Sequence, residues 1–176
     1  MPMIDVNPNE YASFYEGYVN LASKQYASIV LGLEQQLNEV KLYFDGFPPN
    51  KEEFRYEVGK WTPKDIVQHL TDAERIFAYR SLRIARNDTT PLPGFEENSY
   101  VDMAGANNRS LDNLVGEFII VRKATIALFQ NFSEEQLQLL GTASNASVSV
   151  RALGCIILGH TLHHLNVITT RYIAIK

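Results

Sequence analysis

Residues 149–173 read SVRALGCIILGHTLHHLNVITTRYI, beginning at Ser149 and ending at Ile173. Residues in this stretch recur in steps of three and four, which is the spacing of one face of an α-helix. Two histidines lie in the middle of this face, and its other residues are apolar except for a terminal arginine. That face consists of Val150, Leu153, Ile157, His160, His164, Val167 and Arg171. Since an apolar helix face needs partners to cover it, the stretch predicts a core helix of a helical protein.

Upstream of this helix, start signals and apolar periodicity predict three more long helices. Thr62, Pro63 and Asp65 have the pattern of an N-cap, a first-turn proline and a capping-box partner. Ser110 is similarly placed to cap a later helix. The predicted helices cover residues 8–46, 63–86 and 111–129, and the first of them is either continuous or broken near Gly17.

The connections between the helices differ in length. Residues 45–60 form a loop, and residues 87–108 form a long connection rich in proline and glycine. Residues 142–149 form a small polar loop, although residues 143–150 alternate in the manner of a strand. Before the last loop, Ser133 and Gln136 predict a capping box that opens a short helix. Four long helices joined in this way predict a single all-α domain over residues 1–176, a four-helix bundle.

Composition excludes several classes of protein. The chain has 176 residues, of which 45% are hydrophobic, and a net charge of -4 without a basic run, so we expect no nucleic-acid partner. A single cysteine, Cys155, rules out an intramolecular disulfide framework. There is no export signal and no stretch of roughly 18 uninterrupted apolar residues, so we expect a cytoplasmic protein without a membrane partner.

Three of the four histidines lie within one five-residue stretch of the predicted final helix, residues 160–164. His160 and His164 are one turn apart on its buried face, so their Cβ atoms lie about 5–6 Å apart and both rings can hold one metal ion. The only other histidine is His69, on the flank of the apolar stripe of its own helix. His163 lies off the axis of the pair, and we expect it at the rim of the site or beside the ligands. The alternative is that His160 and His164 are neutral core residues hydrogen-bonded to neighbours.

Blocks of the sequence resemble the DinB-like, or YfiT-like, family of metal-dependent enzymes. They are WTPKDIVQHL at residues 61–70, DAER at residues 72–75 and GHTLHH at residues 159–164. The likeness continues through LPGF at 92–95 and EFIIVR at 117–122, and it extends over nearly the whole chain from the first helix onward.

The resemblance implies an up-down-down-up bundle that holds one divalent metal ion through His69, His160 and His164, which match the three ligand positions of the family. Zinc or nickel is expected first, with iron or manganese as alternatives. The resemblance also implies a homodimer. Some family members transfer a low-molecular-weight thiol, such as bacillithiol or mycothiol, to an electrophile, and others resemble amidohydrolases or isomerases of thiol conjugates.

The first hypothesis is therefore a metal-dependent thiol S-transferase, whose partners are a bacillithiol-like small-molecule thiol and an electrophile. The alternatives are a metal-dependent hydrolase of amides or thiol conjugates, and a non-catalytic metal-binding stress protein. Three neutral imidazoles leave the ion its full charge and open positions for water or substrate, which is typical of a catalytic site.

Other residues have both a structural and a functional interpretation. Asp65 lies one turn before His69 and either orients that imidazole or serves only in the capping box. Arg80 and Arg122 fall on apolar stripes, where a guanidinium needs an acidic partner; Glu74 or Glu117 is placed to supply it, and a structural ion pair is favoured over binding of an anionic substrate.

Two further expectations concern the nucleophile and the pocket. Cys155 lies off the centre of the buried stripe of its helix, so it is expected to be a packed small residue rather than the nucleophile. In the long connection, Phe95 and Tyr100 are candidates either for the mouth of a pocket or for anchoring the loop.

Overall fold

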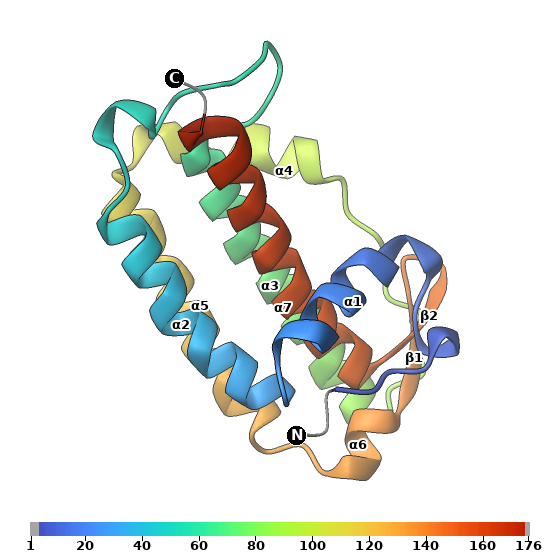
Figure 1. Ribbon diagram of the computed structural model, residues 1–176. Helices are drawn as coiled ribbons and strands as arrows, with labels where there is room; N and C mark the ends of the chain where they lie inside the picture. Colours follow the sequence, from blue (N-terminus) through green and yellow to red (C-terminus); the bar gives the residue numbers. More distant parts are fainter. Residues whose placement is uncertain (1–3, 175–176) are drawn as a thin grey trace.

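The computed structural model describes residues 4–174, and four long helices form its body (Figure 1). Thr62 and Ser110 each cap a helix as predicted, and Ser149 caps the last one. Their side-chain oxygens accept hydrogen bonds from backbone N–H groups of the first turn. The four helices are α2 (Ile29–Asp45), α3 (Pro63–Ala85), α5 (Leu111–Phe129) and α7 (Val150–Ile168), and a π-helical turn at Thr169–Ile173 continues α7.

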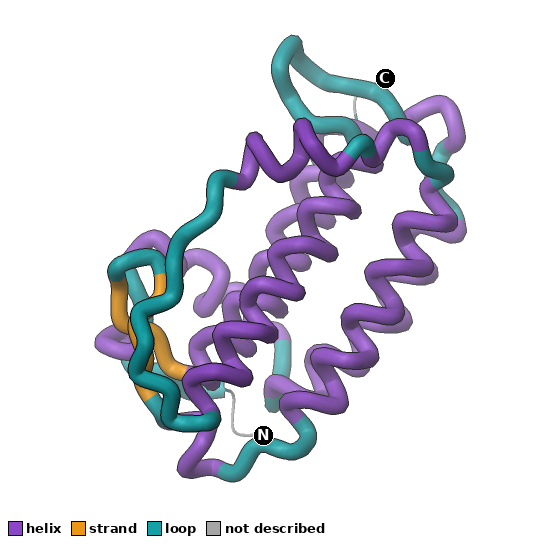
Figure 2. Tube along the Cα trace, turned by 180° about the vertical axis from the view of Figure 1, so that it is seen from behind, coloured by secondary structure: helices purple, strands orange, loops and turns teal. Residues whose placement is uncertain are grey.

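The order of directions is up, down, down and up for α2, α3, α5 and α7 (Figure 1). α3 and α5 run the same way because the connection between them returns along the length of the bundle (Figure 2). This is the topology that the family resemblance implies. It places the start of α3 and the end of α7 at the same end of the molecule, where the loop after α2 also lies.

The first predicted helix, expected over residues 8–46 as either continuous or broken near Gly17, is two helices. α1 (Glu16–Gln25) packs across α7, and the chain then breaks at residues 26–28 rather than near Gly17. The break is stable because the Ser28 hydroxyl accepts a hydrogen bond from the Leu31 N–H and so caps α2. Apolar residues on both sides of the break pack against α7, so their spacing alone does not reveal it.

Two short helices lie in the connections. α6 (Glu134–Gln138) starts at the predicted capping box. The long connection, predicted to lack regular structure, holds α4 (Glu97–Ala104). Glu96 caps α4, and Gly105 ends it with a left-handed φ of 62°, a conformation that glycine adopts without strain.

The loop predicted over residues 142–149 is a β-hairpin for most of its length, in agreement with the strand-like alternation over residues 143–150. β1 (Leu140–Ala143) pairs with β2 (Ala146–Ser149) in antiparallel register. The turn residues between them, Ser144 and Asn145, both have positive φ, as tight hairpin turns require. Leu92 of the long connection also pairs with Ala143, so the hairpin holds the connection against the bundle.

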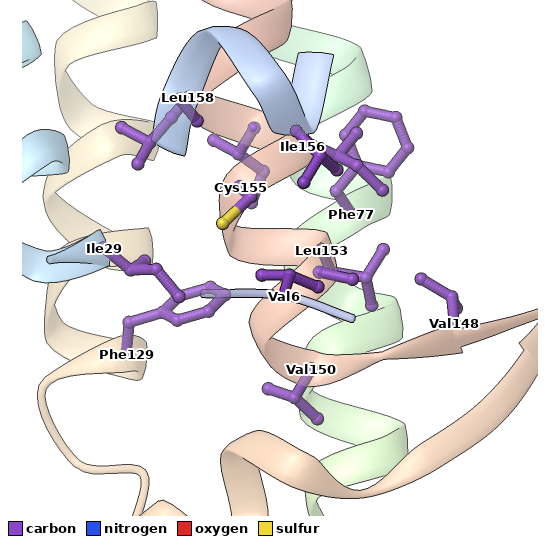
Figure 3. Packing of buried hydrophobic residues seen from close by; sticks show 14 of the residues in the cluster. Val6, Ile29, Phe77, Phe129, Val148, Val150, Leu153, Cys155, Ile156 and Leu158 are labelled. Atoms are coloured by element: carbon purple, nitrogen blue, oxygen red, sulfur yellow. The ribbon is translucent and has the colours of Figure 1, made fainter. Parts of the chain in front are cut away.

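The core consists of two apolar clusters, one towards each end of the bundle. The cluster near the hairpin includes Ile29 and Phe129, which lie together on one side of α7, and Leu153, which lies on the other side of α7 near Val148 (Figure 3). Cys155 of α7 belongs to the same cluster. The other cluster surrounds Phe118, which is fully buried on α5.

A buried polar layer separates the two clusters, formed by Gln36, Glu74, Arg122 and Thr161. Arg122 donates two hydrogen bonds of 2.8 Å to the Glu74 carboxylate, one of 2.8 Å to the Gln36 side chain and one of 3.1 Å to the Thr161 hydroxyl. Each residue comes from a different long helix, so one guanidinium joins α2, α3, α5 and α7. The predicted acidic partner of Arg122 is thus Glu74.

One helix in the described part of the chain, Val150–Ile173, is long and apolar enough to cross a membrane by length and composition. However, 67% of its most apolar window is buried inside the protein, as is usual for the central helix of a bundle.

Candidate metal centre

Three imidazoles meet between α3 and α7. His69 comes from α3, and His160 and His164 lie one turn apart on α7. The Nε2 atom of His160 is 2.9 Å from Nε2 of His69 and 3.1 Å from Nε2 of His164. The ligand atoms of all three residues lie within 4.8 Å of one another. The structure thus brings together the three histidines that the sequence singles out.

The spacing and chemistry of these donors fit a divalent transition-metal ion. Nitrogen ligands about 2.1 Å from a tetrahedral zinc ion are about 3.4 Å apart, which is close to the separations between these Nε2 atoms. Imidazole nitrogen is a ligand that zinc, nickel and iron accept, and three such ligands leave a position for water or substrate. The same spacing also permits hydrogen bonds between neutral imidazole rings in a metal-free protein. Elemental analysis distinguishes this metal-free form from a metal-bound one.

Burial keeps the three imidazoles in the neutral form that binds metal. It lowers the pKa of His69 to about 4 and holds the pKa of His160 and His164 well below the ordinary value for histidine. At neutral pH no proton therefore has to leave the rings before an ion binds. Nδ1 of His164 is buried and has no hydrogen-bond partner among the described residues, so it is the unsatisfied atom of the site.

A close contact between α1 and α7 covers one side of the histidines. A Cβ atom on Gly159 would lie 1.9 Å from the carbonyl oxygen of Tyr18, so the contact requires glycine. The Tyr18 ring is consequently edge-on to His160 and His163, with ring centroids 5.4 and 5.5 Å apart. Phe77 of α3 also packs edge-on to His160, at 6.1 Å, and these aromatic rings remove His160 from water.

Trp61, the only tryptophan in the chain, covers the other side. Its ring lies 4.7 Å from that of His69 and stacks on His164 at 6.3 Å with 23° between the planes. The Trp61 carbonyl accepts a hydrogen bond of 2.6 Å from the Tyr172 hydroxyl, which ties the segment before α3 to the end of α7.

Two cavities lie on either side of Trp61. The first, which we call the histidine cavity, has a volume of about 330 Å³. The second, the polar cavity, has a volume of about 530 Å³. Both sizes suit small-molecule ligands. The histidine cavity is lined by Tyr56, Gly59, Lys60, Trp61, Ile66, Asn98, His163, His164, Val167 and Tyr172. The polar cavity is lined by Arg55, Gly59, Trp61, Asp65, Asn98, Val101, Asp102, Gly105, Ala106, Asn107 and Asn108.

Comparison with known proteins identifies the family. The family model described as the DinB superfamily matches residues 33–168, which is well over half of the chain. The chain belongs to the DinB superfamily. Among solved structures, this DinB-superfamily chain is similar to YfiT from Bacillus subtilis, described as "a probable metal-dependent hydrolase with an unusual four-helix bundle topology". The TM-score is 0.73 at 13% sequence identity, over 95% of this chain and 90% of that chain, and the likeness shows a shared fold. No curated protein matches the chain.

Asp65 has a structural role in this DinB-superfamily protein. Its carboxylate accepts hydrogen bonds from the Thr62 N–H, the Asn107 amide and the Arg55 guanidinium. Of its two predicted roles, the capping box is therefore the one that these contacts support. Among the described hydrogen bonds of Asp65, none goes to His69.

The two predicted arginines lie away from the histidine cavity. Arg122 belongs to the polar layer of the core. Arg80 donates hydrogen bonds of 2.7 Å to the Pro93 carbonyl and 3.0 Å to the Ser144 hydroxyl, so it fastens the long connection and the hairpin turn to α3. The prediction of an acidic partner is wrong for Arg80, because within residues 4–174 its hydrogen-bond partners are neutral oxygens. Glu117, the other predicted partner, pairs with Arg75 and Arg109 instead.

His163 and Cys155 lie where the sequence places them. His163 lines the histidine cavity together with His164, and burial lowers its pKa. Cys155 is fully buried in the apolar cluster near the hairpin, and burial raises the pKa of its thiol to about 12. A thiol so protected is not a nucleophile at neutral pH.

Sequence reasoning missed several residues that shape the site. Trp61 lies in a recognised motif, but its position over two histidines depends on the path of the chain before α3. Phe95 and Tyr100 were candidates for the pocket mouth, yet their rings contact each other at 5.2 Å and line neither of the two cavities. Asn98 and Asp102 of α4 line the cavities instead, and nothing in their local sequence indicates it.

Proposed function

We propose that this protein is a metal-dependent enzyme in which His69, His160 and His164 hold one divalent ion. The observation that carries the proposal is the convergence of three neutral Nε2 atoms beside a cavity of small-molecule size. A structural zinc site is closed by four protein ligands, whereas three histidines next to a cavity leave room for a reacting molecule. The description of YfiT as a probable metal-dependent hydrolase supports the same general class.

The chain supplies the surroundings that such chemistry needs. When bound, a divalent ion of this kind acts as a Lewis acid that lowers the pKa of a coordinated water or thiol. His164 faces the histidine cavity, so a substrate there reaches the metal centre from that side. Trp61 and Tyr18 shield the imidazoles from bulk water, which strengthens electrostatic interactions at the site.

Transfer of a small thiol to an electrophile is the reaction that we propose first. The thiolate is an anion, and both the ion and the Lys60 ammonium at the histidine cavity attract it. The thiol has to come from outside the protein, since Cys155 is buried and its pKa is raised to about 12. In the reaction a sulfur–carbon bond forms and the leaving group of the electrophile departs. Hydrolysis, in which water replaces the thiol, is the second candidate, and the description of YfiT favours it.

The test is an assay of low-molecular-weight thiols with monochlorobimane, using protein loaded with zinc or nickel and protein stripped of metal. We expect product only with the loaded protein. Cys155→Ala should keep the activity because the buried thiol takes no part. His160→Ala should lose it, since the central imidazole of the three is removed.

The outcomes separate the candidate functions. Equal rates with loaded and stripped protein would contradict a metal-dependent enzyme. Metal-dependent cleavage of amides or thiol conjugates, without thiol transfer, would assign hydrolysis. Metal binding without turnover of any of these substrates would favour the non-catalytic binding protein.

A further inference from the structure

The histidine cavity and the polar cavity share an edge. Gly59, Trp61 and Asn98 line both of them, so the two cavities are adjacent. Gly59 has a φ of 81°, in the left-handed region, which allows the chain to turn at this edge.

The charges of the polar cavity leave one carboxylate unmatched. The Arg55 guanidinium pairs with the buried Asp65 carboxylate at 3.2 Å, so these two charges offset each other. Asp102 on α4 is exposed and forms no hydrogen bond or ion pair within the described part of the chain. The polar cavity therefore presents a free negative charge.

The histidine cavity has the opposite polarity. Lys60 is the charged residue that lines it, and its ammonium has no partner among residues 4–174. A metal ion on the three histidines would add to the positive charge at this end.

We propose that the two cavities form a single substrate cleft for a dipolar small molecule, with an anionic, metal-binding group in the histidine cavity and a protonated amine beside Asp102. The inference rests on the proposed function for its anionic end, because that end faces the metal centre. The amine end rests on Asp102 alone and is independent of the metal. An aminoalkane thiol is the simplest molecule with both features.

A matched pair of probes tests the amine end. Aminohexanethiol and mercaptohexanol have the same length and the same thiol, but only the first carries a positive charge at neutral pH. Binding to zinc-loaded protein is followed by calorimetry and by the fluorescence of Trp61. We expect the amine to bind about two- to fivefold more tightly, the range of an exposed ion pair, and the preference to shrink at high salt.

Variants assign the preference to a residue. Asp102→Asn keeps the shape of the side chain and removes its charge, so it should abolish the preference. Asp112→Asn, which removes an exposed carboxylate on α5 outside both cavities, should leave the preference unchanged. Lys60→Gln should weaken the binding of both probes to the same extent, because Lys60 lies beside the thiolate end that the two probes share.

Titrations of metal-free protein with hexylamine separate this inference from the proposed function. If the binding of neither thiol depends on zinc, but hexylamine still binds in a manner that requires Asp102, the proposed metal-dependent function is wrong and the amine site is supported. If both thiols bind equally in a zinc-dependent manner, the amine site is wrong and the function stands. A preference for the amine that persists in Asp102→Asn would also overturn the inference.

Discussion

At the scale of single residues, Gly159 lets α1 pack closely beside the candidate metal centre. It precedes His160, and the absence of a side chain lets the backbone of α1 lie on α7. Tyr18 then covers His160 and His163. The burial that holds the imidazole of His160 neutral therefore depends on a glycine that is not itself a ligand.

Gly159→Ala should destabilise the protein by about 1–3 kcal/mol, because the new methyl group would collide with the Tyr18 carbonyl and push α1 outward. The measurement is urea unfolding, together with zinc affinity, which should also fall. Gly116→Ala is the matched control, since a Cβ there meets nothing within 4 Å and alanine favours the helix. Equal stability of wild type and Gly159→Ala would contradict the packing of α1 described above.

Acid should destabilise the metal-free protein. Histidine in the unfolded chain titrates near pH 6.5, whereas burial lowers the pKa of His69 to about 4. Between these values the unfolded state binds more protons, so the free energy of unfolding decreases as the pH falls, by about 3 kcal/mol for His69 alone. Urea titrations across this pH range measure the slope. His69→Gln should make the free energy of unfolding less dependent on pH in this range. An unchanged pH dependence in that variant would contradict the assignment of the effect to His69.

At the scale of the elements, the polar layer fixes how the four long helices fit together. The Arg122 guanidinium on α5 reaches α3 through Glu74, α2 through Gln36 and α7 through Thr161. Thr161 is the neighbour of His160, and Glu74 lies five residues after His69. The same layer that joins the helices therefore holds α3 and α7 in register at the metal centre.

Arg122→Met should cost about 3–5 kcal/mol of unfolding free energy, because it leaves the Glu74 carboxylate buried without its partner. The double variant Arg122→Met with Glu74→Met should recover part of that loss, since no unpaired charge remains. Chemical denaturation of both variants measures the difference. The single variant Glu74→Met completes the comparison. If the loss of unfolding free energy in the double variant equals the sum of the losses in the two single variants, the Arg122–Glu74 pair does not act as a unit.

The elements also show how far a sequence alone predicts this fold. α3, α5 and α7 are evident from caps and long apolar periods, because each signal is local. The break before Ser28 is hidden, since apolar residues on both sides of it pack on α7. α4 and the hairpin are missed for another reason: both are short, and Leu92 pairs with the hairpin from a distant part of the chain.

At the scale of the whole molecule, the bundle brings distant segments to one end. The segment before α3 provides Lys60 and Trp61, α4 provides Asn98 and Asp102, and the end of the chain provides Tyr172. The cluster of three histidines could be predicted because two of them share a helix face and the family resemblance includes the third. The cleft around them could not, because its shape depends on how loops from separate parts of the sequence meet.

The central claim is that His69, His160 and His164 hold one divalent ion, and elemental analysis of untagged protein tests it most directly. We expect one ion per chain after purification or after addition of zinc or nickel. His160→Ala should bind none and keep its helical circular dichroism, whereas His163→Ala should keep the ion. A metal-to-protein ratio near zero after both metals are added, or wild-type metal content in His160→Ala, would contradict the claim.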